Sequence, residues 1–256
     1  MFLFTKPINK LPIFKGLNLK IHDPQKVALR FVNEDGSEEP VTYQNLFENT
    51  NRLAHVLIQA GVGKGDTFTL LLKNHPEFIY ALFAAVSIGA IAVPIDPRSK
   101  GRKLAFQINN TDAKGIIVGD QFVDGLDEIK DDIKGRSVLG VVYRSHHNVP
   151  VRDEFPDLKK RMDNASPKLP KKTIAFDATR PAQIIHTSGT TGDPKGVVLK
   201  ADRFIIYGMM GDFMWQYQPD DIPYTGLSMT HGNAQSVTLM PALAKGLPAV
   251  ISERFT

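Results

Sequence analysis

The sequence contains no cysteine among its 256 residues. This absence excludes disulfide bonds, thiolate nucleophiles and cysteine-ligated metal sites, and it fits a reducing cytoplasm. A secretory leader is not expected, because Lys6 and Pro7 interrupt the apolar start of the chain. The longest uncharged run, residues 78–93, is shorter than the ~20 residues that cross a bilayer, and Gly89 divides it. We expect a cytoplasmic protein without a transmembrane segment.

The sequence also lacks a large excess of positive or negative charge. The 31 basic and 27 acidic residues leave a net charge of only +4. The one basic cluster, residues 168–172, is interrupted by Leu169 and Pro170 and has the character of a solvated linker. Nucleic acid is therefore not an expected partner. With 42% hydrophobic and 23% charged residues, the chain can bury a substantial core.

Apolar runs typical of strands alternate with amphipathic runs typical of helices. Thr42 is placed to cap a helix that Gly61 ends. The strands are expected at 27–32, 67–72, 90–95, 115–118, 138–142 and 247–252, and the helices at 42–60, 76–87, from a cap at Ser99, at 122–133, at 202–217 and at 237–243. Residues 144–180 are expected to form a long connection. The alternation predicts an α/β fold with helices on both faces of mostly parallel sheets.

One turn, His186–Gly196, concentrates groups that bind phosphate. Glycines let backbone N–H groups approach anionic oxygens, hydroxyls donate further hydrogen bonds, and a lysine adds a mobile cation. The turn supplies all three, in Thr187, Ser188, Gly189, Thr190, Thr191, Gly192, Lys195 and Gly196. Apolar residues 182–185 and 197–199 flank it, which predicts a strand, a loop and a strand. The alternative is a polar hairpin turn that binds nothing.

This turn is not the common phosphate loop, in which Gly-Lys-Ser/Thr runs directly into a helix. It resembles the signature Thr-Ser-Gly-Thr-Thr-Gly-x-Pro-Lys-Gly of the AMP-forming adenylating superfamily, matched at each fixed position by residues 187–196. The superfamily includes acyl-CoA synthetases, aryl-CoA ligases and peptide-synthetase adenylation domains. Thr191 makes the loop resemble that of acyl-CoA ligases, and among these the context of His186 and the run at 231–235 are similar to carnitine or crotonobetaine-CoA ligase-like enzymes. Residues 200–203 depart from the family's usual Thr-His-x-Asn.

The resemblance implies that the turn holds the β- and γ-phosphates of ATP. A carboxylate would then form an acyl adenylate, and coenzyme A would cleave it to a thioester. ATP and coenzyme A are the implied co-substrates, with Mg²⁺ whose ligands lie mostly in family blocks not found in this sequence. We assign no metal ligand and no catalytic residue to the chain. The open alternatives are a non-catalytic nucleotide-binding or interaction module and an adenylation domain that loads a carrier protein.

Two further residues are candidates for the substrate pocket. His231 follows an apolar strand, where an imidazole can line a pocket or simply satisfy a buried carbonyl. The resemblance favours the pocket, since the family carries a histidine or aromatic residue at this point. Gln235 is a weaker candidate for the same wall. Residues 89–97 resemble a family block that we interpret as structural, and the Met and aromatic residues of 202–217 are interpreted as core.

The resemblance also implies a division of the chain. Residues 65–215 would form a first α/β subdomain with the phosphate loop, and residues 20–64 with 216–256 would form part of a second. The family's C-terminal domain would be absent, so we expect a fragment that binds nucleotide weakly and forms no acyl adenylate. The helix at 42–60 would lose cover, which predicts dimerisation or crystal contacts over its face.

The adjacent histidines His146 and His147 are candidate metal ligands by residue type. Adjacent side chains point apart, and no acidic or cysteine partner is near them in the sequence. A solvated loop is therefore the favoured interpretation of this pair.

Overall fold

The computed structural model describes residues 11–17, 19, 21, 23–133, 135–187 and 193–255. Its strands are β1 (Val27–Val32), β2 (Glu38–Thr42), β3 (Thr67–Leu71), β4 (Ile91–Pro94), β5 (Gly115–Gly119), β6 (Ser137–Val142), β7 (Pro181–Thr187), β8 (Lys195–Lys200), β9 (Tyr224–Thr225) and β10 (Ala249–Ser252). Its helices are α1 (Pro12–Gly16), α2 (Tyr43–Gln59), α3 (Pro76–Ile88), α4 (Gly101–Asn110), α5 (Val123–Asp127), α6 (Leu158–Asp163), α7 (Asp202–Phe213), α8 (Gly232–Ala234) and α9 (Met240–Lys245), with 3-10 turns η1 (Asp120–Phe122) and η2 (Ser145–His147) and a π-helical turn η3 (Gln235–Leu239).

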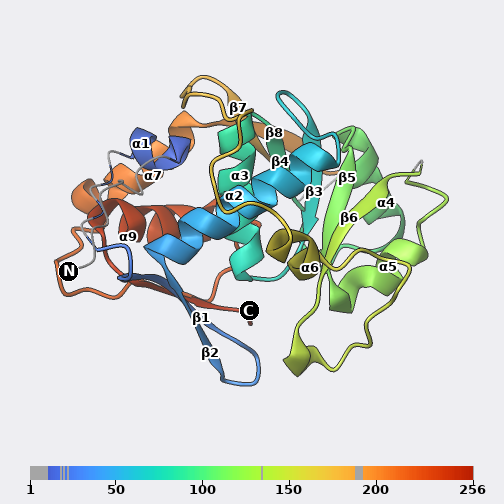
Figure 1. Ribbon diagram of the computed structural model, residues 1–256, viewed down its shortest axis with the longest axis horizontal. Coiled ribbons are helices and arrows are strands. Elements are labelled where there is room, and N and C mark those ends of the chain that lie inside the picture. Colours follow the sequence, from blue (N-terminus) through green and yellow to red (C-terminus); the bar gives the residue numbers. More distant parts are fainter. Residues whose placement is uncertain are drawn as a thin grey trace.

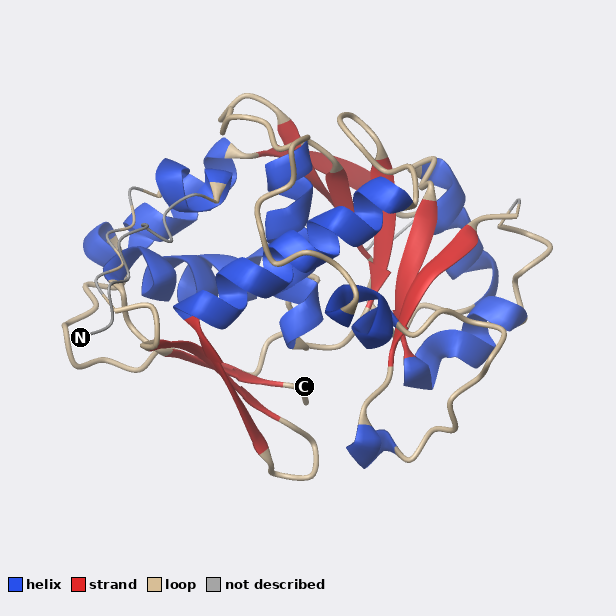
Figure 2. Cartoon of the chain, viewed as in Figure 1, coloured by secondary structure: helices blue, strands red, loops and turns tan. Residues whose placement is uncertain are grey.

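The larger sheet has six strands in the order β6-β5-β3-β4-β7-β8. All neighbours pair in parallel except β7 and β8, which form an antiparallel hairpin. Alternate residues face opposite layers, as the period of a strand requires. In β5, Ile116 and Val118 pack with α4 and α5, whereas Ile117 packs with the layer that contains α3. Figure 2 shows helices on both faces of this sheet, which confirms the predicted α/β class.

The smaller sheet joins the two ends of the chain. Its order is β2-β1-β10-β9, and β1 pairs in parallel with β10, so that residues 29–32 lie beside residues 249–252. In Figure 1, α2 and α3 lie between this sheet and the larger one. One apolar cluster contains Phe31 of β1, Phe83 of α3 and Phe68 of β3. The two sheets therefore share a core through this helical layer.

Helix α2 begins as the sequence predicts, but its outer face is not exposed as expected. Thr42 accepts a hydrogen bond from the Asn45 backbone and Asn45 reciprocates, which forms the predicted cap. The expected exposure of the 42–60 face is wrong. Helix α3 packs along α2, and the guanidinium of Arg52 donates to carbonyls at the end of α6 and just after it, including that of Ala165 at 2.6 Å. Segments of this chain therefore cover α2.

Three local expectations are corrected by packing. Residues 144–180 contain η2 and α6 rather than only a connection. Helix α4 begins after Lys100 with no side-chain cap, so Ser99 does not cap it. Helix α7 buries Phe204 and its two glycines, and its Met and aromatic residues are largely outside the core. A Cβ at Gly208 would lie 3.1 Å from the Ala244 side chain, so the small residues form the contact face.

The expectation of a solvated His146–His147 loop is also wrong. The His147 side chain is only 2% exposed and lies between the carboxylates of Asp120 and Glu253. These acids are remote in sequence and are brought to η2 by other strands. Over the described ranges, none of the helices combines the length and apolarity needed to cross a membrane.

Candidate functional site

The predicted strand, loop and strand around the glycine-rich turn is the β7–β8 hairpin. Thr187 pairs with Lys195, and His186 pairs with Gly196, at the end where the two strands meet the turn. The Thr187 hydroxyl also donates to the Lys195 carbonyl at 3.4 Å. Residues 188–192, which carry Ser188, Gly189, Thr190, Thr191 and Gly192, lie outside the described part of the chain. The ladder nevertheless places both ends of the turn side by side.

The hairpin ends at the edge of the larger sheet where ligands collect in α/β proteins. Strand β7 runs parallel to β4, so the carboxyl ends of both strands lie on the same edge. A pocket with about 410 Å³ of empty space, part of it open to solvent, lies there. Its lining residues are Pro94, Asp96, Ser99, Lys103, Gln107, His186, Thr187, Thr230 and His231.

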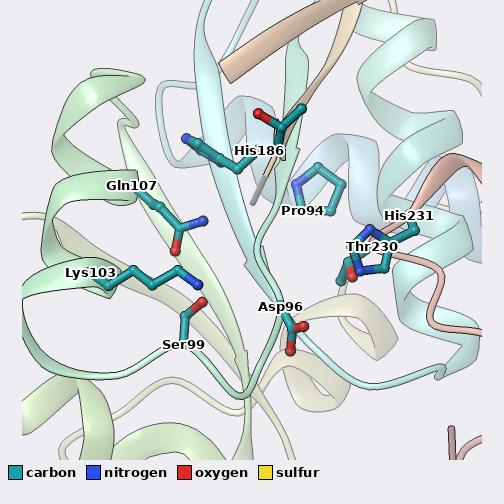
Figure 3. Close-up of a pocket in the computed structure, with 9 residues that line it drawn as sticks. Pro94, Asp96, Ser99, Lys103, Gln107, His186, Thr230 and His231 are labelled. Carbon is teal, nitrogen blue, oxygen red and sulfur yellow. The ribbon is translucent and has the colours of Figure 1, made fainter. Parts of the chain in front are cut away.

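Two walls of this pocket come from segments far apart in the sequence. Figure 3 shows Lys103 and Gln107 of α4 on one side and Thr230 and His231, before α8, on the other. Asp96 lies between these walls, just after β4. The lining thus offers a carboxylate, an ammonium, two imidazoles and hydroxyls to one ligand.

Buried polar atoms in the pocket have no hydrogen-bond partner among the described residues. Both ring nitrogens of His186 and the Oε1 atom of Gln107 are in this state. His186 is 9% exposed, and burial lowers the pKa of its imidazole. A neutral imidazole presents one donor and one acceptor. Because buried polar groups normally find partners, these atoms indicate a site completed by a ligand.

The pocket carboxylate is held in its charged form. Burial raises the pKa of Asp96, but hydrogen bonds from the side chain and backbone of Arg98 outweigh it, and the net pKa is lowered. The Arg98 Nη2 and Asp96 Oδ2 atoms are 2.7 Å apart. Asp96 therefore contributes a negative charge to the pocket at neutral pH.

The structure brings together some of the predicted residues and separates others. Thr187 and His231 line the same pocket, and His231 is exposed. Lys195 and Gly196 are exposed on β8, next to that pocket. Gln235 is fully buried, and its amide donates to the Met229 carbonyl at 3.0 Å. It therefore braces the loop that carries His231, and it is not among the residues that line the pocket.

Sequence reasoning missed much of the α4 wall. The interpretation of residues 89–97 as purely structural is wrong, because Pro94 and Asp96 line the pocket, as do Ser99, Lys103 and Gln107. A signal was present, because a polar segment directly follows the buried strand β4. Polar residues after such a strand lie at the ligand-binding edge of a parallel sheet.

The fold and this pocket define an α/β domain that binds its ligand at the carboxyl ends of parallel strands. Within that class, the chain belongs to the AMP-binding enzyme family, whose model matches residues 21–256. This finding confirms the superfamily that the glycine-rich turn indicates.

Relatives and solved structures agree with this family. The chain is 31% identical over 231 residues to crotonobetaine/carnitine–CoA ligase of Salmonella paratyphi B, covering 90% of this chain and 44% of the relative. It resembles ATP-bound MatB of Rhodopseudomonas palustris with a TM-score of 0.78 at 24% identity, covering 96% of this chain and 46% of that one. The fold also matches the anthranilate CoA ligase AuaEII, with a TM-score of 0.79 at 17% identity, covering 98% and 46%. The chain thus spans slightly less than half the length of these proteins.

Proposed function

We propose that the protein containing this chain is an AMP-forming acid–thiol ligase. A carboxylate oxygen attacks the α-phosphorus of ATP, the bond from that phosphorus to the β-bridging oxygen breaks, and pyrophosphate leaves. The sulfur of coenzyme A then attacks the acyl carbon, AMP leaves, and the thiol proton passes to solvent. The single observation that carries the proposal is the hairpin in which Thr187 lies opposite Lys195 beside the polar pocket.

In this proposal the turn stabilises the leaving pyrophosphate. Hydroxyls of Thr187, Ser188, Thr190 and Thr191, backbone amides at Gly189, Gly192 and Gly196, and the Lys195 ammonium would neutralise the outer phosphates. Such preorganised donors lower a barrier by positioning and electrostatics. Mg²⁺ would supply further charge neutralisation on ATP, and we assign none of its ligands to this chain. No residue of the chain needs to act as a nucleophile.

The pocket would border the carboxylic acid. His231 and Thr230 lie across from α4, and Asp96 between them disfavours a bound carboxylate directly beside it. We therefore place the acid's carboxylate toward His186 and the turn. Gln235 would act indirectly, by bracing the loop before His231.

The proposed division into subdomains is supported by the origin of the two sheets. Strands β3 to β8 come from residues 67–200, within the first subdomain at 65–215. Strands β1, β2, β9 and β10 come from the segments assigned to the second, 20–64 and 216–256. We propose that the 256 residues alone bind nucleotide but form no acyl adenylate.

Product analysis tests the function. The longest open reading frame that contains this chain is incubated with Mg-ATP, a panel of carboxylic acids, and either coenzyme A or a phosphopantetheinyl carrier protein. We expect AMP, pyrophosphate and an acyl-CoA. Acylation of the carrier alone would favour the carrier-loading alternative. ATP binding without AMP formation for any acid would favour a non-catalytic nucleotide-binding module.

A further inference from the structure

Three histidines surround one buried carboxylate where the two sheets approach each other. Glu253 directly follows β10 of the smaller sheet. His146 and His147 form η2 after β6 of the larger sheet, and His75 is the N-cap residue of α3 after β3. Because β3, β6 and β10 are all parallel strands that end here, residues distant in sequence converge at one point.

Each imidazole points one ring nitrogen at the carboxylate. The Nε2 atoms of His75 and His147 lie 3.0 Å and 2.6 Å from Glu253 Oε1, and Nε2 of His146 lies 2.8 Å from Oε2. The ligand atoms of His75, His147 and Glu253 all lie within 4.8 Å of one another. Their side chains are 1%, 2% and 0% exposed, and that of His146 is 9% exposed. Imidazole nitrogen and carboxylate oxygen form the ligand set of many zinc sites.

A second carboxylate orients His147 from behind. The Nδ1 atom of His147 lies 2.6 Å from Asp120 Oδ1. Asp120 is fixed by backbone N–H groups of Gln121 at 2.7 Å and Arg144 at 2.8 Å. Histidines that bind metal through one nitrogen commonly donate the other N–H to a carboxylate, which fixes the ring. Here, His147 has that arrangement with Nε2 facing the cluster.

The surroundings carry an excess of negative charge. Within the described part of the chain, five acids lie around the cluster and pair with two permanent cations, Lys73 and Arg144, besides the histidines; the acids are Glu34, Glu39, Glu77, Asp120 and Glu253. Five carboxylates against two cations leave three negative charges while the imidazoles are neutral. A divalent cation would therefore reduce the local imbalance.

We propose that His75, His147 and Glu253 bind one Zn²⁺ ion, with a solvent molecule as the fourth ligand. At a tetrahedral zinc ion with bonds of about 2.0–2.1 Å, neighbouring ligand atoms are about 3.3 Å apart. The separations of 3.0 Å and 2.6 Å to Glu253 Oε1 thus need to widen by less than about 1 Å. The ion would tie β10 of the smaller sheet to η2 and α3 beside the larger one. The proposed zinc site is separate from the pocket beside the hairpin, since none of its protein ligands lines that pocket.

Zinc titration of the 256-residue chain tests this site. The chain, freed of any affinity tag and stripped with a chelator, is titrated with ZnCl₂ by calorimetry. We expect one saturable zinc per chain and a melting temperature that rises with zinc. Cobalt(II) in place of zinc should give the intense visible bands of a tetrahedral site. These wild-type measurements do not depend on whether any variant folds.

Four variants locate the ion. Glu253→Gln and His147→Gln preserve side-chain size, and each should weaken zinc binding by at least about 10-fold. Asp120→Asn leaves the ligands in place and should weaken binding by about 10–100-fold, as loss of an orienting partner does. His55→Gln is the matched control, because His55 contacts the Lys168 carbonyl outside the cluster and should leave binding unchanged. Circular dichroism without metal identifies any variant that fails to fold.

Two results would overturn the proposal. One is a wild-type chain that binds no stoichiometric zinc and gives no tetrahedral cobalt spectrum, which would mean that protons alone hold the cluster together. The other is zinc binding that remains unchanged in folded Glu253→Gln and His147→Gln, which would place the ion elsewhere.

Discussion

The β7–β8 hairpin and the cluster around Glu253 both lie at the carboxyl ends of parallel strands, but their polar atoms differ in state. In the pocket beside the hairpin, the ring nitrogens of His186 are buried without a described partner. In the cluster, Glu253 accepts from His75, His146, His147 and the Glu34 backbone. The first region lacks partners that a substrate can supply, whereas the Glu253 carboxylate has its partners within the chain and only Nδ1 of His75, among the three described imidazoles, is buried without one. We therefore expect changes in the cluster to affect folding and changes in the hairpin to affect catalysis.

The largest effect on stability is expected from Glu253→Ala. Removing one member of a buried charged network leaves the others desolvated and unpaired, which costs about 3–5 kcal/mol. Urea denaturation of the chelator-treated chain measures the change in unfolding free energy. Glu154→Ala is the control, because Glu154 is exposed and pairs with Arg152 at the surface, where solvent screening leaves little effect on stability. Equal effects of the two substitutions would contradict the claim that the buried cluster around Glu253 stabilises the fold.

A smaller effect is expected from Arg144→Ala beside the same cluster. Arg144 bridges Glu39 of β2 and Glu77 of α3, and its side chain is 13% exposed. Losing hydrogen bonds to charged, partly buried groups costs about 1.5–3 kcal/mol. Arg152→Ala provides the comparison in the same denaturation assay, since Arg152 contacts Asp124, Asp127 and Glu154 at the surface. If Arg152→Ala costs as much, burial does not determine the value of these pairs.

The smallest effect is the pH dependence that His186 adds. Its folded-state pKa is lowered by burial below the ordinary value of about 6.5. The folded chain therefore prefers neutral imidazole, and the associated stability is present above pH ~6.5 and lost as the pH falls through the folded pKa. In His186→Gln, acidification from about pH 7.5 to about pH 5.5 should reduce the unfolding free energy less than in the wild type. An identical loss in both proteins would show that the site does not oppose protonation.

Much of the fold could be predicted from the sequence because the deciding signals are local. The cap at Thr42 and the continuous apolar runs of β3 and β5 need only neighbouring residues. Helix α7 could not be predicted as well, because its buried face is set by Gly208 and Gly211 against α9 rather than by its largest apolar residues. The cover of α2 likewise depends on α6 and the segment after it, which carry little periodicity.

The two sites differ in the same way. The turn at 187–196 is contiguous, so that its residue types alone indicated phosphate binding, whereas its pocket also required Lys103 and Gln107 from α4. The cluster was missed because adjacent histidines seemed to lack acidic partners. Those partners, Asp120 and Glu253, follow β5 and β10, and only the sheet order brings them to η2. Contacts that depend on sheet order are not visible in a local pattern.

The most direct test of the proposed function is pyrophosphate release by the longest open reading frame that contains this chain, compared between wild type and Lys195→Ala. Lys195 is exposed at the start of β8, so its loss should leave the melting temperature within experimental error. Loss of one stabilising group at the leaving phosphates should reduce the rate by about 10²–10³-fold with every acid that is turned over. A folded Lys195→Ala protein with an unchanged rate of pyrophosphate release would contradict the assignment of this turn to the phosphates of ATP.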